Sequence, residues 1–207
     1  DLKGKHLFPG LVDMRVFVGE PGFEYKENFR TLSDAALSGG VTSVVTMPNT
    51  NPILDNVSIV DFLKTRGRDK SKINIFPCAS LTKNIEGSNM TEFGLLQKKG
   101  IIAFTDGIRT IQNPRLMSRI MNSAKDLGCL IMQHAEDYEL AKNGMINSGI
   151  IATKLGLSGI PEIAERVLIE RDLTLLEKVK CRYHISQLSS QKSVEVIKHR
   201  KEIVKFS

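Results

Sequence analysis

An alternation of strand-like and helix-like segments along the 207 residues constrains the fold more than any other feature. Short runs rich in β-branched and apolar residues predict strands at 11–18, 41–47, 73–79, 101–105, 130–133 and 182–187. Capping residues and helical spacing predict helices at 27–38, 55–66, 91–100, 113–127, 161–179 and 189–199. Strands that alternate with helices about every 30 residues specify right-handed βαβ units and a parallel sheet.

The number of these units indicates an α/β protein of the (β/α)8 TIM-barrel type. Six units, an irregular or helical insert before residue 158 and a seventh strand-like run at 203–206 are present. An eight-stranded barrel needs about 250 residues, so we expect 1–207 to be a single barrel domain that is incomplete at its C-terminal end. An open doubly wound sheet is the alternative, although no Gly-x-Gly-x-x-Gly turn follows any strand.

Composition excludes several classes of protein. A content of 41% hydrophobic and 25% charged residues is ordinary for a globular chain with a buried core. No apolar run approaches the roughly 20 residues of a membrane span, and no signal-peptide pattern opens the chain, so we expect a cytoplasmic protein that does not bind membranes. The 29 Lys and Arg residues form no basic block typical of nucleic-acid binding, and three distant cysteines predict neither disulfides nor a zinc ribbon.

Polar residues cluster where the predicted strands end, which is where a parallel barrel places its active site. Asn49 follows the second strand, Asp106 the fourth and His134 the fifth, while His184 lies in the sixth. Two histidines and an aspartate are ligands that suit zinc or a similar divalent ion. The alternative is that each histidine satisfies local hydrogen bonds in a buried turn.

The first strand lies in the stretch FPGLVDMRVFVGEPG, residues 8–22. Because side chains alternate along a strand, Asp13, Arg15 and Phe17 are predicted to share one face. A large cation beside an aromatic ring near the end of a buried strand is unusual.

Several motifs together resemble the dihydroorotases of the amidohydrolase superfamily. They are PGLVDM, EPG, GGVTSVVTMPNTNP, LTKNIEG, AFTDG, QHAED, LGLSGIPEIAE and RYHISQLSS, in that order. Members of this family are zinc enzymes that interconvert carbamoyl-aspartate and dihydroorotate in pyrimidine synthesis. The resemblance implies an amidohydrolase-type barrel with zinc as its cofactor, and it implies an eighth strand and a small β domain that this sequence does not contain.

The resemblance also implies that part of the metal site is lost. Arg15 and Phe17 stand where the family has its His-x-His metal ligands, and neither side chain has a lone pair to give a metal. A cation at this place also repels a metal ion. Gly19 stands where the family has an arginine that grips the substrate carboxylate. We therefore expect Arg15 to take the place of the metal and to pair with Asp106 or Asp13.

Other family positions are retained. His134 and His184 match the remaining histidine ligands, and Asn49 matches an asparagine that contacts substrate. The family has Ser-Asp-Asp-Gly where this chain has Thr-Asp-Gly, so Asp106 matches the bridging aspartate in an ungapped alignment. The catalytic aspartate of the family comes from the eighth strand, beyond residue 207.

Three functions remain open from the sequence. The favoured one is a homo-oligomeric homologue with impaired or lost catalysis, for which the family resemblance implies a structural or regulatory role with aspartate transcarbamoylase. The second is an active dihydroorotase or related cyclic amidohydrolase with a single metal on His134, His184 and a strand-eight aspartate. The third is a scaffold that serves another cyclic amide or no ligand.

Overall fold

The computed structural model of the chain describes residues 3–200, so the strand expected at 203–206 lies outside the described residues. Its main strands are β1 (Leu11–Val16), β2 (Val41–Thr46), β3 (Asn74–Pro77), β4 (Ala103–Phe104), β5 (Leu130–His134) and β8 (Arg182–Ser186). The helices between and after them are α1 (Phe29–Ser38), α2 (Val57–Lys70), α3 (Phe93–Lys98), α4 (Pro114–Leu127), α7 (Ile163–Val179) and α8 (Gln191–His199). The predicted alternation of strands and helices is confirmed.

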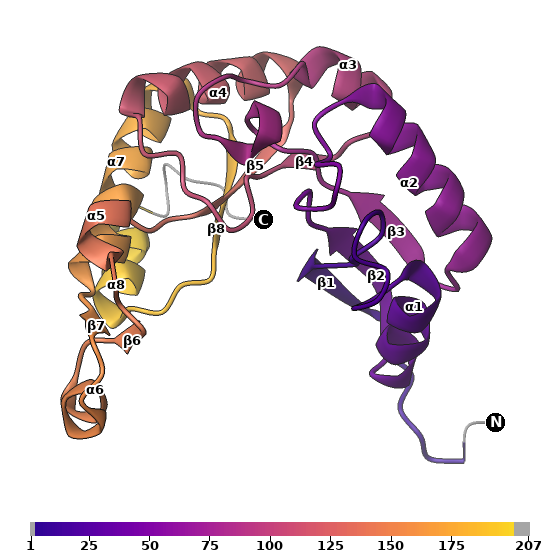
Figure 1. Cartoon of the computed structure of the whole chain (residues 1–207), viewed down its shortest axis with the longest axis horizontal. Coiled ribbons are helices and arrows are strands. Elements are labelled where there is room, and N and C mark those ends of the chain that lie inside the picture. Colours follow the sequence, from indigo (N-terminus) through magenta and orange to yellow (C-terminus); the bar gives the residue numbers. More distant parts are fainter. Residues whose placement is uncertain (1–2, 201–207) are drawn as a thin grey trace.

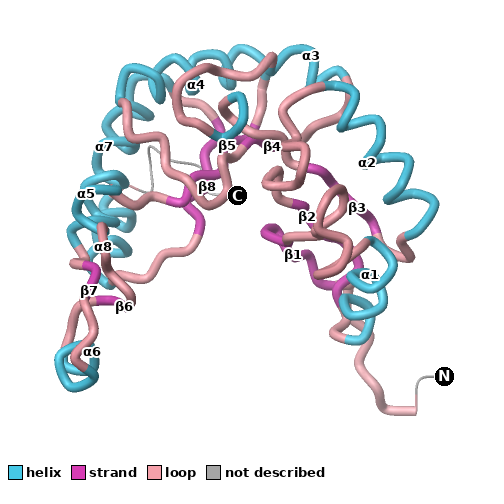
Figure 2. The backbone as a smooth tube through the Cα atoms, in the orientation of Figure 1, coloured by secondary structure: helices cyan, strands magenta, loops and turns pink. Residues whose placement is uncertain are grey.

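All of these strands run parallel. They form two three-stranded sheets, β1-β2-β3 and β4-β5-β8, which an isolated parallel bridge between Ala79 and Phe104 joins. Figures 1 and 2 show an arch with the strands on its concave inner side and the helices on its outer side. Within residues 3–200, β1 and β8 are the two outermost strands of the joined sheets and are not paired with each other, so the described strands form an open arc.

The core lies mainly between the strands and the outer helices. A large apolar cluster there includes Val44, Phe104, Ile131 and Tyr183, whereas a smaller inner cluster includes Val45 and Met132. Alternation along each strand explains this division. Because Ile131 and Tyr183 point outward to the helices, the alternate residues His134 and His184 point to the inner side of the arch.

Local sequence signals explain where the helices begin and end. The side chain of Asn113 accepts hydrogen bonds from Arg115 N and Leu116 N at the start of α4, and Pro114 occupies the first helical position. Gly128 ends that helix in a left-handed conformation (φ 68°). Caps of this kind define where each helix ends and where the loop to the neighbouring strand begins.

Between β5 and α7 the chain leaves the regular pattern. This insert contains α5 (Tyr138–Ala141), α6 (Ile150–Leu155) and a two-stranded parallel pair of β6 (Ile146–Asn147) and β7 (Gly159–Ile160). Figure 1 shows β6, α6 and β7 projecting from one end of the arch. The short 3-10 helix η1 (Lys83–Ile85) lies between β3 and α3. No helix in the described part is both long and apolar enough to cross a membrane.

Candidate active site at the strand ends

Arg15 lies one residue before the end of β1 and is partly buried. Its Nη2 donates to the carbonyl oxygen of Gly107, after β4, at 3.3 Å. The expected ion pair with Asp106 or Asp13 is not formed. Asp13 instead accepts a hydrogen bond from the backbone N–H of Arg15 at 2.9 Å. Burial lowers the pKa of Arg15, so the guanidinium is held in a place where its charge is poorly solvated.

Phe17 and Gly19 follow Arg15 at two further positions where the family resemblance implies functional side chains. A register shift between Asp13 and Val16 interrupts the alternation of β1, and Phe17 lies beyond the strand with its ring 6.0 Å from that of Phe23. Asp13, Arg15 and Phe17 therefore do not form one regular row. Gly19 has φ 73°, and a Cβ atom there would lie 2.7 Å from Glu27 O. This position has no room for an arginine side chain.

Asp106 is fully buried after β4. Its Oδ1 accepts from Thr82 N at 2.9 Å, and its Oδ2 accepts from the Thr82 hydroxyl. Burial raises the pKa of Asp106 to about 6, whereas the hydrogen bonds from Thr82 and the charge of Arg109 act in the opposite direction. Both carboxylate oxygens are thus engaged by the polypeptide.

Asn49 follows β2 and points toward the same place as Arg15. Its Oδ1 is buried without a hydrogen-bond partner in the described structure. A Cβ atom at Gly107 would lie 3.9 Å from that oxygen. Since the Gly107 carbonyl also accepts from Arg15, the side chains of Asn49 and Arg15 meet at this glycine.

His134 and His184 face the inner side of the arch at different depths. In the β5–β8 register, His134 is opposite Ser186 and His184 is opposite Met132. The two histidines are therefore offset by two residues along the strands, roughly 7 Å. His134 Nδ1 is buried and has no partner within the described residues. Burial lowers the pKa of His134, and the charge of Arg15 lowers it further, whereas Glu136 and Glu165 act to raise it.

A cavity of about 430 Å³ opens at the ends of β5 and β8. His134 and Gln187 line it, together with Glu136, Glu165 and residues of the insert, whereas His184 does not. Gln187, the residue after β8 and in a left-handed conformation (φ 57°), was missed from the sequence. The sequence predicts a strand over 182–187 that includes Gln187, whereas the structure ends β8 at Ser186 and places Gln187 after it.

These residues do not fit a metal ion. Within residues 3–200, no group of three or more His, Cys, Asp or Glu side chains is placed to hold one. Arg15 places a positive charge at the carboxyl ends of the strands, and Thr82 already hydrogen-bonds to the Asp106 carboxylate. His134 and His184 lie at different depths along their strands.

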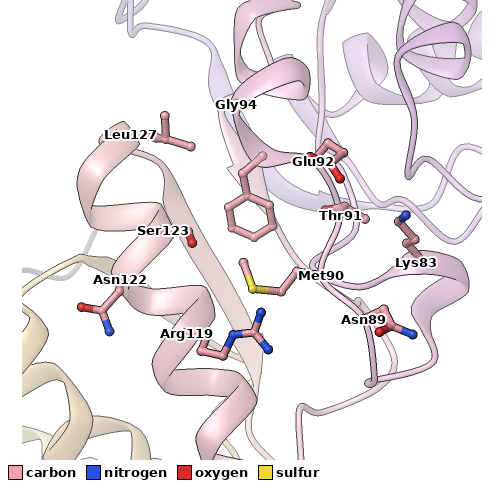
Figure 3. A pocket seen from close by; sticks show the side chains of 11 residues that line it. Lys83, Asn89, Met90, Thr91, Glu92, Gly94, Arg119, Asn122, Ser123 and Leu127 are labelled. Carbon is pink, nitrogen blue, oxygen red and sulfur yellow. The ribbon is translucent and has the colours of Figure 1, made fainter.

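A second and larger cavity, of about 830 Å³, lies away from the carboxyl ends of the strands. Figure 3 shows it between α4, which carries Arg119, Asn122 and Ser123, and the segment with Lys83 and Glu92. None of the strand-end residues described above lines it. We therefore assign the candidate active site to the strand ends.

Comparison with known proteins identifies the relatives of this chain. The family model for dihydro-orotase-like proteins matches residues 4–193. The dihydroorotase of Syntrophus aciditrophicus is 42% identical over 202 residues, and that of Thermoanaerobacter sp. is 40% identical over 202 residues. This chain belongs to the dihydroorotase-like family. Each alignment covers 98% of this chain and 47% of the relative, so the chain spans about half the length of these curated relatives.

Solved structures of the same architecture are more distant in sequence. The L-hydantoinase (dihydropyrimidinase) from Arthrobacter aurescens superposes with a TM-score of 0.77 at 20% identity, over 96% of this chain and 46% of that one. The D-hydantoinase from Bacillus sp. AR9 gives a TM-score of 0.69 at 19% identity, over 96% of this chain and 46% of that one. These matches show an amidohydrolase-type fold for this dihydroorotase-like chain.

Proposed function

We propose that this dihydroorotase-like protein serves in de novo pyrimidine biosynthesis with impaired or lost hydrolysis, as a homo-oligomeric structural partner of aspartate transcarbamoylase. The observation that carries the proposal is the position of Arg15, whose guanidinium occupies the end of β1 and bonds to Gly107 O. The ligands of the proposed ancestral reaction are dihydroorotate and carbamoyl-aspartate.

The physical argument concerns the hydroxide that such hydrolysis requires. A zinc ion generates hydroxide near neutral pH only when several protein ligands hold it. Here a fixed cation lies at the strand edge, and two like charges about 4 Å apart repel by about 4 kcal/mol at an effective dielectric constant of 20. The described residues supply no replacement set of three ligands.

The projecting insert supports a role in association. Ile150, Ile151 and Leu155 of α6 are 75%, 66% and 62% exposed, and Met145 beside them is 73% exposed. Large apolar side chains gathered on one projection are typical of a surface that contacts another protein.

A second candidate is an amidohydrolase with a reduced, single-metal site. One observation favours it: Nδ1 of His134 is buried without a partner in the described part of the chain, as a metal-binding nitrogen is before its ion arrives. This candidate needs His184 and a further carboxylate to complete the site.

The deciding experiment measures dihydroorotate hydrolysis by the purified full-length protein in zinc-containing buffer, alone and with its aspartate transcarbamoylase. We expect no turnover by the protein alone, less than one zinc per chain by mass spectrometry, and co-elution with aspartate transcarbamoylase in gel filtration. Turnover by the protein alone with bound zinc supports the single-metal candidate and overturns the proposal. The double variant R15H/F17H is the matched control, and it is expected to increase zinc content.

A further inference from the structure

We propose that the cavity of about 830 Å³ between α4 and residues 83–94 binds a phosphomonoester that carries a planar ring, of the nucleoside monophosphate kind. Arg119, Asn122 and Ser123 hold the phosphate, and the ring lies against Met90. This site is separate from the carboxyl ends of the strands and does not depend on the proposed function.

One side of α4 supplies three polar groups to the cavity. Arg119, Asn122 and Ser123 are three and four residues apart, so they lie next to one another on the helix surface. Within residues 3–200, the side chains of Arg119 and Ser123 form no ion pair or hydrogen bond. Asn122 Nδ2 donates to Ser118 O at 2.7 Å, which leaves its second N–H free to donate. A guanidinium fork beside a hydroxyl and an amide N–H is a set of donors that suits phosphate oxygens.

The charges around the cavity favour an anion at Arg119. Lys83 also lines the cavity, whereas Glu92 is the only acidic side chain among the described residues that line it. Figure 3 shows Glu92 on the same side as Lys83, with Met90 between these two residues and Arg119. A phosphate bound at Arg119 therefore meets a positive charge that no carboxylate of the lining neutralises.

The apolar part of the lining suits a flat ring. Phe93 is 3% exposed, and its ring stacks on that of Phe104 with 4.1 Å between the centroids. Met90 is half-buried and packs against the same core cluster, and a methionine thioether makes favourable contacts with aromatic rings. The cavity volume is within the roughly 300–1,000 Å³ typical of sites for small organic molecules. A bare phosphate ion would leave most of this space empty.

Hydrogen bonds hold the segment that carries Met90 in place before a ligand binds. Met90 forms an isolated antiparallel bridge with Thr82. Thr91 N donates to Leu81 O at 3.1 Å, and the Thr91 hydroxyl donates to Ser80 O at 2.7 Å. A preformed site of this kind loses little conformational entropy when its ligand binds.

The test is isothermal titration of the full-length protein with four probes. They are adenosine monophosphate, cytidine monophosphate, ribose-5-phosphate and adenosine. We expect a nucleoside monophosphate to bind more tightly than ribose-5-phosphate, which has no base. Adenosine, which has no phosphate, should not bind at concentrations up to about 1 mM. R119Q is expected to weaken binding of the phosphate esters about tenfold or more, because charge-assisted hydrogen bonds are lost.

Two further variants make the result specific. R115Q is the matched control, because Arg115 is exposed on the same helix and does not line the cavity, and it should bind as the unaltered protein does. M90A is expected to weaken binding of the nucleoside monophosphate and to leave binding of ribose-5-phosphate nearly unchanged. Circular dichroism verifies that R119Q and M90A are folded.

Each outcome decides one part of the proposal. Failure of both nucleoside monophosphates to bind, or equal binding by R119Q and R115Q, overturns the site. Equal affinity for ribose-5-phosphate and the nucleoside monophosphates overturns the placement of the ring against Met90. R15Q should bind as the unaltered protein does, and weakened binding by R15Q would place the ligand at the strand ends instead. None of these results depends on whether the protein hydrolyses dihydroorotate, so the proposed function stands or fails separately.

Discussion

Two partly buried arginines, Arg15 in β1 and Arg171 on α7, show how differently the same side chain is used. Arg171 on α7 is 17% exposed, and its Nε and Nη2 lie 2.8 and 2.7 Å from Asp172 Oδ1. Its Nη1 donates to Ile111 O at 2.7 Å and to Gln112 O at 2.9 Å. The side chain of Arg15, by contrast, makes one hydrogen bond within residues 3–200, to Gly107 O at 3.3 Å. Nε and Nη1 of Arg171 are hydrogen-bonded within the fold and its Nη2 is ion-paired, whereas only Nη2 of the Arg15 guanidinium has a hydrogen-bond partner among the described residues.

The Arg171 region also contacts the loop that leads to the strand ends. Arg171 fixes the loop between β4 and α4, in which the Thr110 hydroxyl donates to His134 O and accepts from Glu136 N. The Tyr183 hydroxyl completes the buried cluster by donating to Asp172 Oδ2 at 2.6 Å. Substitutions in this outer cluster should thus change stability more than substitutions at Arg15 do.

The largest expected effect is that of R171Q. The substitution breaks a buried ion pair and leaves the fully buried Asp172 without its cation, which typically costs about 3–5 kcal/mol. Urea denaturation followed by circular dichroism measures the free energy of unfolding. R115Q, an exposed position on α4, is the control and should stay within about 0.5 kcal/mol of the unaltered protein. If R171Q lowers the free energy of unfolding by less than about 1 kcal/mol, the cluster of Arg171, Asp172 and Tyr183 contributes less to stability than we infer.

Asp106 provides a pH-dependent test, because burial raises its pKa to about 6 in the folded chain from a reference of 3.8. Between these values the folded state binds more protons than the unfolded state, so this group makes stability fall as pH rises from about 4 to about 6. The difference amounts to about 3 kcal/mol at 1.36 kcal/mol per pKa unit.

D106N removes this titration and keeps an acceptor for Thr82 N. Relative to the unaltered protein, the variant should therefore become more stable as pH rises from about 4 to about 7, as measured by urea denaturation at several pH values. A pH-independent difference between the two proteins contradicts the assignment of a raised pKa to Asp106.

Y183F tests how much the hydrogen bond from Tyr183 to Asp172 contributes to stability. Loss of the hydroxyl removes one donor to the buried Asp172 carboxylate, for which we expect a loss of about 1–3 kcal/mol. The control is Y25F, since Tyr25 is 80% exposed. If both substitutions change the urea midpoint equally, the hydrogen bond to Asp172 does not contribute to stability.

The sequence predicted the order of strands and helices because caps and breakers act locally. Asn113, Pro114 and Gly128 bound α4 as expected. The end of α2 was placed at residue 66, yet the helix continues to Lys70. Gly67 does not break it because the glycine packs against Ile75 of β3, where a Cβ atom would lie 3.3 Å from that side chain. Such a tertiary contact leaves no local sequence signal.

The candidate site was predictable only in part. Asn49, Asp106 and His134 do lie at the strand ends, because strand direction alone decides this. The partner of Arg15 was predicted wrongly, because Thr82, from a loop far away in sequence, already engages Asp106. The depth of His184 depends on strand register, which the order of residues does not reveal.

The smallest expected effect on stability is that of R15Q, the substitution matched to R171Q. Removal of one long hydrogen bond and of a partly desolvated charge should leave the free energy of unfolding within about 0.5 kcal/mol of the unaltered value, measured by the same urea titration. A loss above about 2 kcal/mol would mean that Arg15, like Arg171, is consumed by the fold. An unchanged stability would separate the two arginines by their contribution to the fold, because only a side chain whose donors the fold leaves unused can be removed without loss of stability.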